Sequence, residues 1–477
     1  MTIYQNLIAG EWTGAEAVEN INPSDTKEVV GLYASGSAAD TRNAIAAAKA
    51  AFPAWSRSGI WERHVILKKA GDEIMARKDE LGALLAREEG KTLPEAIGET
   101  IRASQIFEFF AGEALRLAGE VVPSVRPNIG VEITREPLGV IGIITPWNFP
   151  IAIPAWKIAP ALCYGNTIVF KPAELVPGCS WAIVDILNRA GLPKGVLNLV
   201  MGKGSIVGQT MLDSPDLAGI TFTGSVGTGK RVAVSSIEHH RKIQLEMGGK
   251  NPMVVLDDAD LSVAVEAAAN SAFFSTGQRC TASSRLIVTE GIHDRFVAAM
   301  TEKLKTLNVD HALKTGTHIG PVVDERQLKT DTDYIEIGKK EGAKLAFGGE
   351  LISRDTPGFY LQPTLFTEAT NQMRISREEI FGPVASVIRV KDYEEALAVA
   401  NDTPFGLSSG IATTSLKHAT HFKRNAEAGM VMVNLPTAGV DFHVPFGGRK
   451  GSSYGSREQG KYAAEFFTTV KTAYTLA

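Results

Sequence analysis

The chain carries a short stretch, Ser275-Thr276-Gly277-Gln278-Arg279-Cys280-Thr281, in which a cysteine is flanked by small and polar residues. A thiol becomes a useful nucleophile when it is partly exposed and close to a base or a helix N-terminus, because the thiolate is the reactive form. A free cysteine is also among the residue types most often buried as a small hydrophobe. The local sequence leaves both interpretations of Cys280 open.

Two polar side chains elsewhere suit a reaction at a carbonyl carbon. Asn148 lies in Thr145-Pro146-Trp147-Asn148-Phe149-Pro150, where two prolines stiffen the loop and can hold the amide ready to donate to a developing oxyanion. Glu246 ends a predicted strand and precedes two glycines, which let a ligand approach closely, so its carboxylate suits a general base. An asparagine that ties down a turn and an ordinary surface glutamate are the simpler explanations.

Three further stretches suit a dinucleotide. Gly202-Lys203-Gly204 with Gly208 is a near miss to the fingerprint G-x-G-x-x-G and by itself indicates only a turn. The stretch from Phe222 to Gly229 follows a predicted strand and opens a helix, whose N-terminal amides can hold a pyrophosphate. Lys171 and Glu174 close another strand and can bind the hydroxyls of an adenosine ribose, although a solvated charge pair explains them as well.

These residues follow the strands of a predicted parallel sheet. Apolar runs at 140–144, 166–170, 196–200, 218–222 and 242–246 alternate with helical patterns, which is typical of a doubly wound sheet with helices on both faces. In such sheets ligands bind outside the carboxyl ends of the strands. A second α/β block begins near residue 251 and contains Cys280 between a helix (261–274) and a strand (284–288).

The flanking segments have other patterns. Helical periodicity over 39–55 and 61–89 predicts two or three long helices, and the same periodicity over 92–119 predicts another. Residues 121–137 then alternate like two strands, and 466–474 reads as a further exposed strand. Exposed strand edges need covering, so we expect these segments to form an oligomer contact.

Composition limits the classes of function. The 477 residues are 44% hydrophobic and 21% charged, with a formal net charge of -4, which is typical of a globular enzyme and gives no basic surface for nucleic acid. The length predicts two or three domains. The three cysteines predict neither a disulfide framework nor a metal site. Without a signal peptide or an apolar membrane span, we expect a cytoplasmic protein that acts on small molecules and binds no membrane.

Seven signatures in a fixed order carry a resemblance to a known family. They are Thr145-Pro146-Trp147-Asn148-Phe149-Pro150, Lys171-Pro172-Ala173-Glu174, Phe222-Thr223-Gly224-Ser225, Leu245-Glu246-Met247-Gly248-Gly249-Lys250, Gly277-Gln278-Arg279-Cys280, Glu379-Ile380-Phe381-Gly382-Pro383 and Pro445-Phe446-Gly447-Gly448. Together they resemble the NAD(P)-dependent aldehyde dehydrogenase superfamily almost from end to end. Within it, the chain is most similar to bacterial α-ketoglutaric semialdehyde dehydrogenases.

The resemblance implies a fold and an assembly. We expect a Rossmann-like cofactor domain (1–118 and 138–247), an α/β catalytic domain (248–445) and a small β oligomerisation arm (119–137 and 460–477). It also implies a homodimer or a homotetramer.

The resemblance implies roles for individual residues. Cys280 would attack the aldehyde, Asn148 would hold the oxyanion, and Glu246 would activate the water that hydrolyses the thioester, with Lys157 and Glu458 relaying protons to it. The implied cofactor residues are Thr145, Pro146, Trp147, Lys171, Glu174, Gly204, Gly208, Phe222, Gly224, Ser225, Glu379 and Phe381. The candidate substrate residues are Phe149, Trp156, Arg279, Thr281 and Phe446.

Cofactor and substrate are less tightly constrained. Glu174 favours NAD, because a carboxylate repels a 2′-phosphate, whereas Lys171 keeps NADP possible. The favoured substrate is α-ketoglutaric semialdehyde (2,5-dioxopentanoate), and its acid group needs a cation, for which Arg279 and Arg449 are candidates. Alternatives are succinic semialdehyde, a sugar-derived aldehyde such as an anhydro-sugar, or a catalytically silent member of the fold. The chain departs from the family at Ser453, where a glycine commonly follows the serine.

Glu246 and the surroundings of Cys280 also bear on two other enzyme classes. A CoA-acylating dehydrogenase lacks the glutamate base, so Glu246 favours hydrolysis. A cysteine hydrolase needs a paired histidine, and no histidine motif lies near Cys280 in the sequence.

Overall fold

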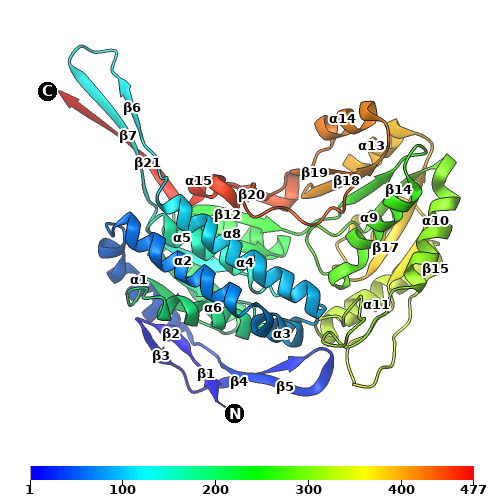
Figure 1. Ribbon diagram of the computed structural model, residues 1–477, viewed down its shortest axis with the longest axis horizontal. Coiled ribbons are helices and arrows are strands. Elements are labelled where there is room, and N and C mark those ends of the chain that lie inside the picture. Colours follow the sequence, from blue (N-terminus) through cyan, green and yellow to red (C-terminus); the bar gives the residue numbers. More distant parts are fainter. Residues whose placement is uncertain (1, 477) are drawn as a thin grey trace.

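The computed structural model describes residues 2–476 and contains two large sheets, each covered by helices on both faces (Figure 1). The first sheet has the strand order β20 (Ser453–Gly455), β12 (Lys242–Met247), β11 (Gly219–Gly224), β8 (Val140–Ile144), β9 (Thr167–Lys171), β10 (Leu197–Leu199), β2 (Asn6–Ile8) and β3 (Glu11–Thr13). Strands β12, β11, β8, β9 and β10 are parallel, and both edges are antiparallel. The predicted α/β fold is therefore confirmed.

The strands of the first sheet are apolar on both sides, because successive side chains point to opposite faces. Ile141 packs into one core and Val140 into the other. Helices on the first face are α2 (Ile60–Ala76), α3 (Lys78–Glu89), α4 (Leu93–Ala114), α5 (Ala152–Cys163) and α6 (Pro177–Arg189). Helices on the second face are α1 (Ala38–Trp55), α7 (Gln209–Asp213) and α8 (Val226–Glu238).

The second sheet is built in the same way. Its order is β15 (Lys344–Phe347), β16 (Thr364–Ala369), β17 (Val384–Val390), β14 (Arg285–Thr289), β13 (Pro252–Val255), β18 (Ser408–Ala412) and β19 (Met430–Val433), parallel except at β15. One face carries α9 (Leu261–Phe273) and α10 (Glu290–Lys305). The other carries α11 (Glu325–Lys340), α12 (Arg374–Arg377), α13 (Tyr393–Asn401) and α14 (Leu416–Asn425).

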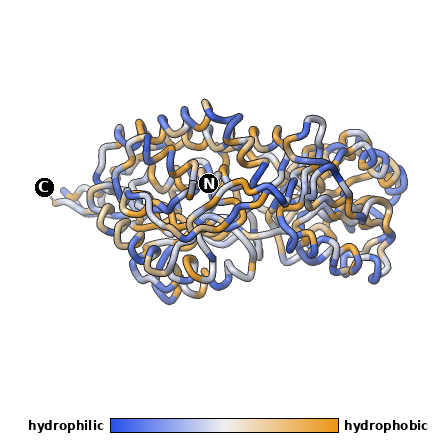
Figure 2. The backbone as a smooth tube through the Cα atoms, turned by 90° about the horizontal axis from the view of Figure 1, so that it is seen from below, coloured by the Kyte–Doolittle hydropathy of each residue, from blue (hydrophilic) through white to orange (hydrophobic). Residues whose placement is uncertain are grey.

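Two small sheets complete the fold. One consists of β1 (Ile3–Tyr4), β5 (Asp25–Ala34) and β4 (Ala17–Asn22). The other, which we call the arm, consists of β21 (Thr468–Leu476), β7 (Ile129–Pro137) and β6 (Glu120–Pro123), and it projects from the body of the molecule (Figure 1). Seen from below, the two large layers lie side by side and the C-terminal end lies at one extremity (Figure 2).

Three segments differ from the sequence-based expectation. The helix expected over 92–119 ends at Ala114, and Leu115, the residue that follows, is 42% exposed. Residues 460–467, assigned to the arm, form a 3-10 turn and the short helix α15 (Ala464–Phe467), and Phe466 and Phe467 are buried in the core of the first layer. Ser453–Gly455 returns as an edge strand of the first sheet, far from it in sequence. The functional division into domains stays a prediction.

Candidate active site

The site lies where the two large sheets meet. Strand β12 ends with Glu246 and Met247, and four residues later β13 begins the second sheet. The Cys280 loop connects α9 to β14 of that second sheet. Glu246 and Cys280 therefore come from different layers, and only the packing of the layers brings them together.

The loop before Cys280 has a strained backbone. Ser275 and Thr276 have φ angles of 51° and 57°, in the left-handed region that costs free energy for residues with a Cβ. Ser275 is held by Glu95, whose Oε1 accepts from its N–H at 2.8 Å and from its hydroxyl at 3.0 Å. Gly277 also has a positive φ, and a Cβ there would lie 2.3 Å from the carbonyl oxygen of Gly382. These contacts fix the chain that presents Cys280.

Cys280 is half-buried and opens on a cavity of about 340 Å³. Burial raises the pKa of its thiol to about 12, and the negative charges of Glu246, Glu379 and Glu458 add to this effect. The backbone N–H of Thr281 acts in the opposite direction. The three carboxyl groups therefore oppose formation of the thiolate.

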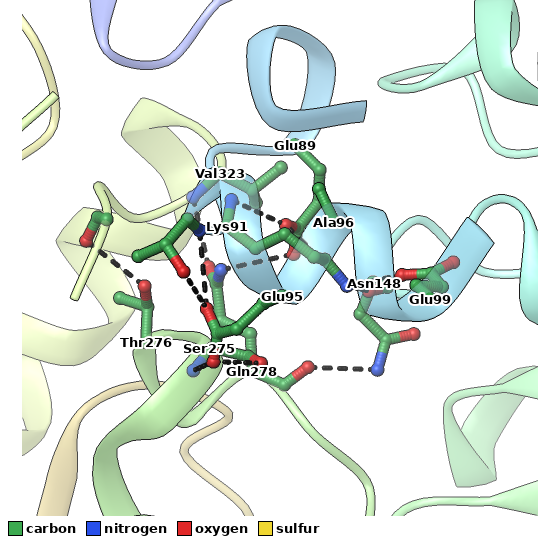
Figure 3. Close-up of polar contacts among 12 residues, drawn as sticks. Glu89, Lys91, Glu95, Ala96, Glu99, Asn148, Ser275, Thr276, Gln278 and Val323 are labelled. Atoms are coloured by element: carbon green, nitrogen blue, oxygen red, sulfur yellow. Dashed lines mark hydrogen bonds and ion pairs between the residues drawn. The ribbon is translucent and has the colours of Figure 1, made fainter. Parts of the chain in front are cut away.

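Asn148 lies beside the Cys280 loop in a buried polar network (Figure 3). Its Nδ2 donates to the carbonyl oxygen of Gln278 at 2.9 Å, and its second N–H has no partner among the described residues. Its own carbonyl oxygen accepts from Lys91 Nζ at 2.6 Å, and Lys91 also donates to Glu99 at 2.7 Å. Hydrogen bonds thus hold both the side-chain amide of Asn148, which is predicted to stabilise an oxyanion, and the backbone carbonyl of the same residue.

Glu246 is buried and has one hydrogen-bond donor. Ser453 Oγ donates to its Oε2 at 2.5 Å. Burial and the charge of Glu458 raise the pKa of Glu246 well above its usual range, while Ser453, Lys157 and Arg457 lower it. A carboxyl group with a raised pKa is suited to proton transfer near neutral pH.

Lys157 and Glu458 form a buried ion pair, as the predicted relay requires. Lys157 Nζ also donates to Thr221 Oγ1 at 2.7 Å. The second carboxylate oxygen of Glu458 is buried without a partner among the described residues. This oxygen is therefore free to accept a further hydrogen bond.

The five candidate substrate residues all line the cavity at Cys280. The five are Phe149, Trp156, Arg279, Thr281 and Phe446. Trp156 and Phe446 stack with ring centroids 5.4 Å apart and form an apolar wall. Arg102 of α4 lines the same cavity, and no sequence signal distinguished it from the core residues of its helix. Arg449 is exposed and does not line the cavity.

A second cavity, of about 370 Å³, lies at the carboxyl ends of the first sheet. The parallel strands run in the order β10-β9-β8-β11-β12, so the direction of winding reverses between β8 and β11, where such sheets bind ligands. Of the residues predicted to hold the cofactor, Lys171, Glu174, Gly204 and Gly208 line this cavity. Lys203 and Arg231 line it too and were not singled out from the sequence.

Glu174 is the best-defined of these groups. Its Oε1 accepts from the N–H of Gly204 at 2.6 Å and lies 3.9 Å from Lys171 Nζ. Ser225 is the N-cap of α8, and its hydroxyl accepts from the N–H of Thr228 at 3.4 Å. The remaining residue of this group, Phe222, is buried in the core, where a Cβ at Gly224 would lie 2.6 Å from its ring.

The other predicted cofactor residues lie nearer the junction of the two layers. Glu379 accepts from the N–H of Gly249 at 2.9 Å, and burial raises its pKa to about 7. Trp147 contacts Phe381 edge to face, with ring centroids 5.3 Å apart. Thr145 is buried at the end of β8, and its hydroxyl has no partner among the described residues. Pro146 follows it in the same loop.

Comparisons with known proteins identify the family. The family model described as "Aldehyde dehydrogenase family" matches residues 12–473. The chain belongs to the aldehyde dehydrogenase family. It is 45% identical to the alpha-ketoglutaric semialdehyde dehydrogenase of Bacillus subtilis, over 99% of this chain and 98% of that protein. It is 42% identical to the 2,5-dioxopentanoate dehydrogenase of Saccharolobus solfataricus, over 99% of both chains.

A solved structure gives the same result for the fold. The betaine aldehyde dehydrogenase of Staphylococcus aureus in complex with NAD+ superposes with a TM-score of 0.97 at 33% identity, over 99% of this chain and 95% of that chain. The aldehyde dehydrogenase fold predicted from the seven signatures is therefore confirmed. Within residues 2–476, no helix is long and apolar enough to cross a membrane.

The residues that sequence reasoning missed share one property. Lys91, Glu99, Arg102 and Ser453 act through contacts with segments far away in the chain. Glu99 lies in a helical block that the pattern indicated only as core packing, and Lys91 lies in the short connection before that block. Ser453 was noted as a departure from the family pattern, but nothing in the sequence indicated that it lies beside Glu246.

Proposed function

We propose that this aldehyde dehydrogenase oxidises an acidic aldehyde to a carboxylic acid with NAD(P)+, through a thiohemiacetal and a thioester on Cys280. The observation that carries the proposal is the opening of Cys280 on a cavity, with Asn148 and Glu246 beside its loop. A catalytically silent protein has no need of this arrangement, because each of these buried polar groups costs stability.

Each residue has a distinct task in this mechanism. Cys280 loses its proton and attacks the aldehyde carbon, and the free amide N–H of Asn148 and the backbone N–H of Cys280 stabilise the oxyanion. NAD(P)+, which Glu379 and Phe381 would hold, would supply the acceptor for the hydride of the thiohemiacetal carbon. Glu246 then removes a proton from water, the resulting hydroxide attacks the thioester carbon, and cleavage of the C–S bond releases the acid and the Cys280 thiolate. Lys157 and Glu458 carry the proton away from Glu246.

The residues fit a dinucleotide. The cavity at β9 is lined by Gly204, where a Cβ would lie 3.8 Å from Glu174 Oε1 and would narrow the space. Glu174 suits the ribose hydroxyls, and the N-terminus of α8 suits a phosphate. Glu379 and Phe381 would hold the nicotinamide end. We propose NAD as the preferred cofactor, because Glu174 would repel a 2′-phosphate, and NADP as the alternative, because Lys171, Lys203 and Arg231 line the same cavity.

For the substrate we propose α-ketoglutaric semialdehyde. The two relatives named above act on this compound according to their names, and they match this chain over nearly its full length. Succinic semialdehyde has the same charge and one carbon fewer, and a sugar-derived aldehyde would place hydroxyl groups against Trp156 and Phe446. The apolar wall and the arginines of the cavity favour the semialdehydes over the sugar.

The arm supports the proposal of a homodimer or homotetramer. Its three strands leave Val121 82% exposed and Tyr474 60% exposed, although an isolated three-stranded sheet needs an apolar face to be buried. A second copy of the chain would cover these side chains.

A substrate panel tests the function. Initial rates are measured for α-ketoglutaric semialdehyde, succinic semialdehyde, a sugar-derived aldehyde and pentanal, with NAD+ and with NADP+, with and without CoA. We expect the highest kcat/KM for α-ketoglutaric semialdehyde with NAD+ and no dependence on CoA. No oxidation of any aldehyde would contradict the proposed reaction, and a requirement for CoA would contradict hydrolysis by Glu246.

A further inference from the structure

The cavity at Cys280 contains two arginines that have no carboxylate partner within the described residues. Arg102 and Arg279 both line it, and neither forms an ion pair. Most of the other lining side chains are apolar or small, including Phe149, Trp156 and Phe446. A guanidinium in such surroundings has lost water, so a ligand that replaces the lost hydrogen bonds is strongly favoured.

Two glutamates also line the cavity, but their oxygens are already used. Glu99 accepts from Lys91 and, through Oε1, from the backbone N–H groups of Ile151 and Ala152, both at 3.0 Å. Glu95 accepts from Thr92 at one oxygen and from Ser275 at the other. The cavity therefore presents free donors and no comparable free carboxylate acceptor.

Arg102 is better placed for a ligand than Arg279. The NH2 group of Arg279 donates to the carbonyl oxygen of Asn270, next to the loop that carries the nucleophile. Arg102 comes from α4, and in the described part of the chain its guanidinium makes one hydrogen bond, to Gln459 Oε1 at 3.1 Å. Its guanidinium carbon lies 5.9 Å from the centre of the Trp156 ring, so the aromatic wall orients the group.

The C-terminal segment positions Arg102. Gln459 is fully buried, and its φ of 61° places a residue with a Cβ in the left-handed region. The side-chain oxygen of Gln459 accepts from Arg102, directly after Glu458 of the proposed proton relay. The chain thus sustains local strain where it holds one end of Arg102.

We propose that Arg102 is the specificity-determining residue for acidic aldehydes and binds the carboxylate at the end of the substrate remote from the aldehyde, with Arg279 as a second donor. A planar guanidinium with several free N–H groups matches a carboxylate, or the carboxylate and adjacent ketone of a 2-oxo acid, in a two-point contact. This inference rests on the proposed oxidation at Cys280 and adds the residue that selects its substrate class.

The test compares an acidic and a neutral aldehyde on the same variants. We expect Arg102→Gln to lower kcat/KM for α-ketoglutaric semialdehyde about 100-fold, the usual loss when one partner of a buried charge pair is removed, mostly through KM. The same variant is expected to oxidise pentanal, which has five carbons and no charge, within about threefold of the unchanged enzyme. Arg102→Lys is expected to recover part of the loss, because it keeps the charge without the two-point geometry.

The control is Arg116→Gln, which removes an exposed arginine just after the same helix. It should leave both rates unchanged. An equal decrease of kcat/KM for both substrates in Arg102→Gln would show a structural role and overturn the inference. An unchanged preference for the acidic aldehyde would overturn it as well. Absence of pentanal and semialdehyde oxidation in the unchanged enzyme would instead contradict the proposed reaction.

A second, independent observation concerns Ser453. Strand β20 pairs with β12 in the register Glu246 opposite Ser453, so the two side chains are direct cross-strand neighbours. Ser453 Oγ donates to Glu246 at 2.5 Å and accepts from the N–H of Gly448 at 2.6 Å. A glycine at this position, the residue that the family pattern favours, would supply no such donor.

We infer that Ser453 is a positioning residue, which holds the Glu246 carboxylate in its charged form and sets the pH range in which it accepts a proton from water. The charged groups that act on Glu246 are Glu458, Lys157 and Arg457. Cys280 is coupled to it from the second layer. Of these groups, only Glu458 and the thiolate of Cys280 disfavour the negative charge on Glu246. The Ser453 hydroxyl stabilises that charge together with Lys157 and Arg457.

The test is the pH dependence of thioester hydrolysis. Hydrolysis is followed as decay of the acyl-enzyme by rapid quench and mass spectrometry, from pH 6 to pH 10. We expect Ser453→Ala to raise the pKa of Glu246 and move the ascending limb of the profile to higher pH by about one unit, because a hydrogen bond to the charged form is lost. Ser453→Thr keeps the hydroxyl and is expected to restore the profile.

The matched control is Ser452→Ala. Ser452 accepts from the N–H of Gly406 in the same turn and does not contact Glu246. If Ser453 served local structure alone, Ser453→Ala and Ser452→Ala would both lower the rate of thioester hydrolysis, and neither would shift the ascending limb of its pH profile. Superimposable profiles for Ser453→Ala and the unchanged enzyme would overturn the inference.

Discussion

At the scale of the residue, the site concentrates buried charge around one thiol. Burial and three carboxyl groups raise the pKa of Cys280 to about 12, and burial raises the pKa of Glu379 to about 7 against the lowering effects of Gly249 and Lys250. A low dielectric strengthens each of these charge interactions, so replacing one titratable group shifts the pKa values of the others. Removing a negative charge near Cys280 therefore favours the thiolate.

This coupling predicts the pH dependence of alkylation. Below its raised pKa, the thiolate fraction of Cys280 rises with pH, so the rate of reaction with iodoacetamide should increase about tenfold per pH unit between pH 7 and pH 10. Glu246→Gln should accelerate alkylation at a given pH, because a charge that raises the pKa is gone. Peptide mass spectrometry measures the rate for each cysteine.

Cys163 and Cys179 are the internal controls for alkylation. Both are almost fully buried, and burial raises the pKa of both thiols, so neither should react in the folded enzyme. A plateau in the rate at Cys280 near pH 8 would contradict the raised pKa.

Replacement of the proposed nucleophile should abolish the reaction without abolishing cofactor binding. Cys280→Ala should abolish aldehyde oxidation while NAD+ still binds, because the dinucleotide cavity lies at the first sheet. Loss of turnover is measured by absorbance of the reduced cofactor, and binding by calorimetry. Turnover in this variant would contradict the mechanism.

The buried pair of Lys157 and Glu458 predicts a non-additive effect on stability. Glu458→Leu leaves Lys157 buried with only Thr221 as a polar partner and should lower the free energy of unfolding by about 3 kcal/mol. The double variant Lys157→Met, Glu458→Leu removes both charges and should be more stable than the single variant. Denaturant unfolding of the two variants measures this difference, and additive losses would contradict it.

At the scale of the element, α4 combines packing with chemistry. Its residues Glu95, Gly98, Glu99 and Arg102 recur at the spacing of one helical face and line the cavity. Further along the same helix, Ile106, Phe107 and Phe110 pack into the core. One amphipathic helix thereby supports the Cys280 loop, anchors Asn148 through Lys91 and Glu99, and carries Arg102.

Replacement by alanine should have opposite effects on stability at two glycines of this region. A Cβ at Gly98 meets no atom within 4 Å, so Gly98→Ala should stabilise the protein by roughly 0.5–1 kcal/mol through helix propensity. At Gly277 the φ is positive and a Cβ would clash with Gly382, so Gly277→Ala should destabilise the protein by more than that and lower kcat. Thermal unfolding and steady-state rates measure both. Equal effects of the two substitutions would contradict the assigned geometry.

At the scale of the whole molecule, the arm is the part that cannot bury its own apolar side chains. β21 pairs with β7 over its full length, from Thr468 opposite Pro137 to Leu476 opposite Ile129. Val470 and Tyr474 nevertheless remain 56% and 60% exposed. An exposed, apolar sheet edge is an association site.

The arm predicts which side chains hold the proposed oligomer together. Val470→Glu together with Tyr474→Glu should shift the protein to a smaller assembly without unfolding the body, because both side chains are already exposed in the single chain. Sedimentation velocity measures the mass. Leu416→Glu, which changes an 80% exposed leucine at the start of α14, is the control and should leave the assembly unchanged. An unchanged mass in the arm variant would contradict the proposed contact.

The sequence by itself determined what depends on local pattern. Strand–helix alternation predicted the doubly wound first sheet, and short signatures predicted Cys280, Glu246 and Asn148, because strand ends, turns and helix starts are encoded by adjacent residues. It could also indicate an acidic substrate, but it offered Arg279 and Arg449 equally as the cation.

Only the tertiary structure decided what depends on distant segments meeting. Arg102 reads as one more residue of a core helix until α4 packs beside the Cys280 loop, and Arg449 proves to be exposed. Ser453 reads as a departure in a loop until β20 pairs with β12 and places its hydroxyl on Glu246. Hydrogen bonds and charge pairs act over a few ångströms in space, and separation along the chain does not reveal that distance.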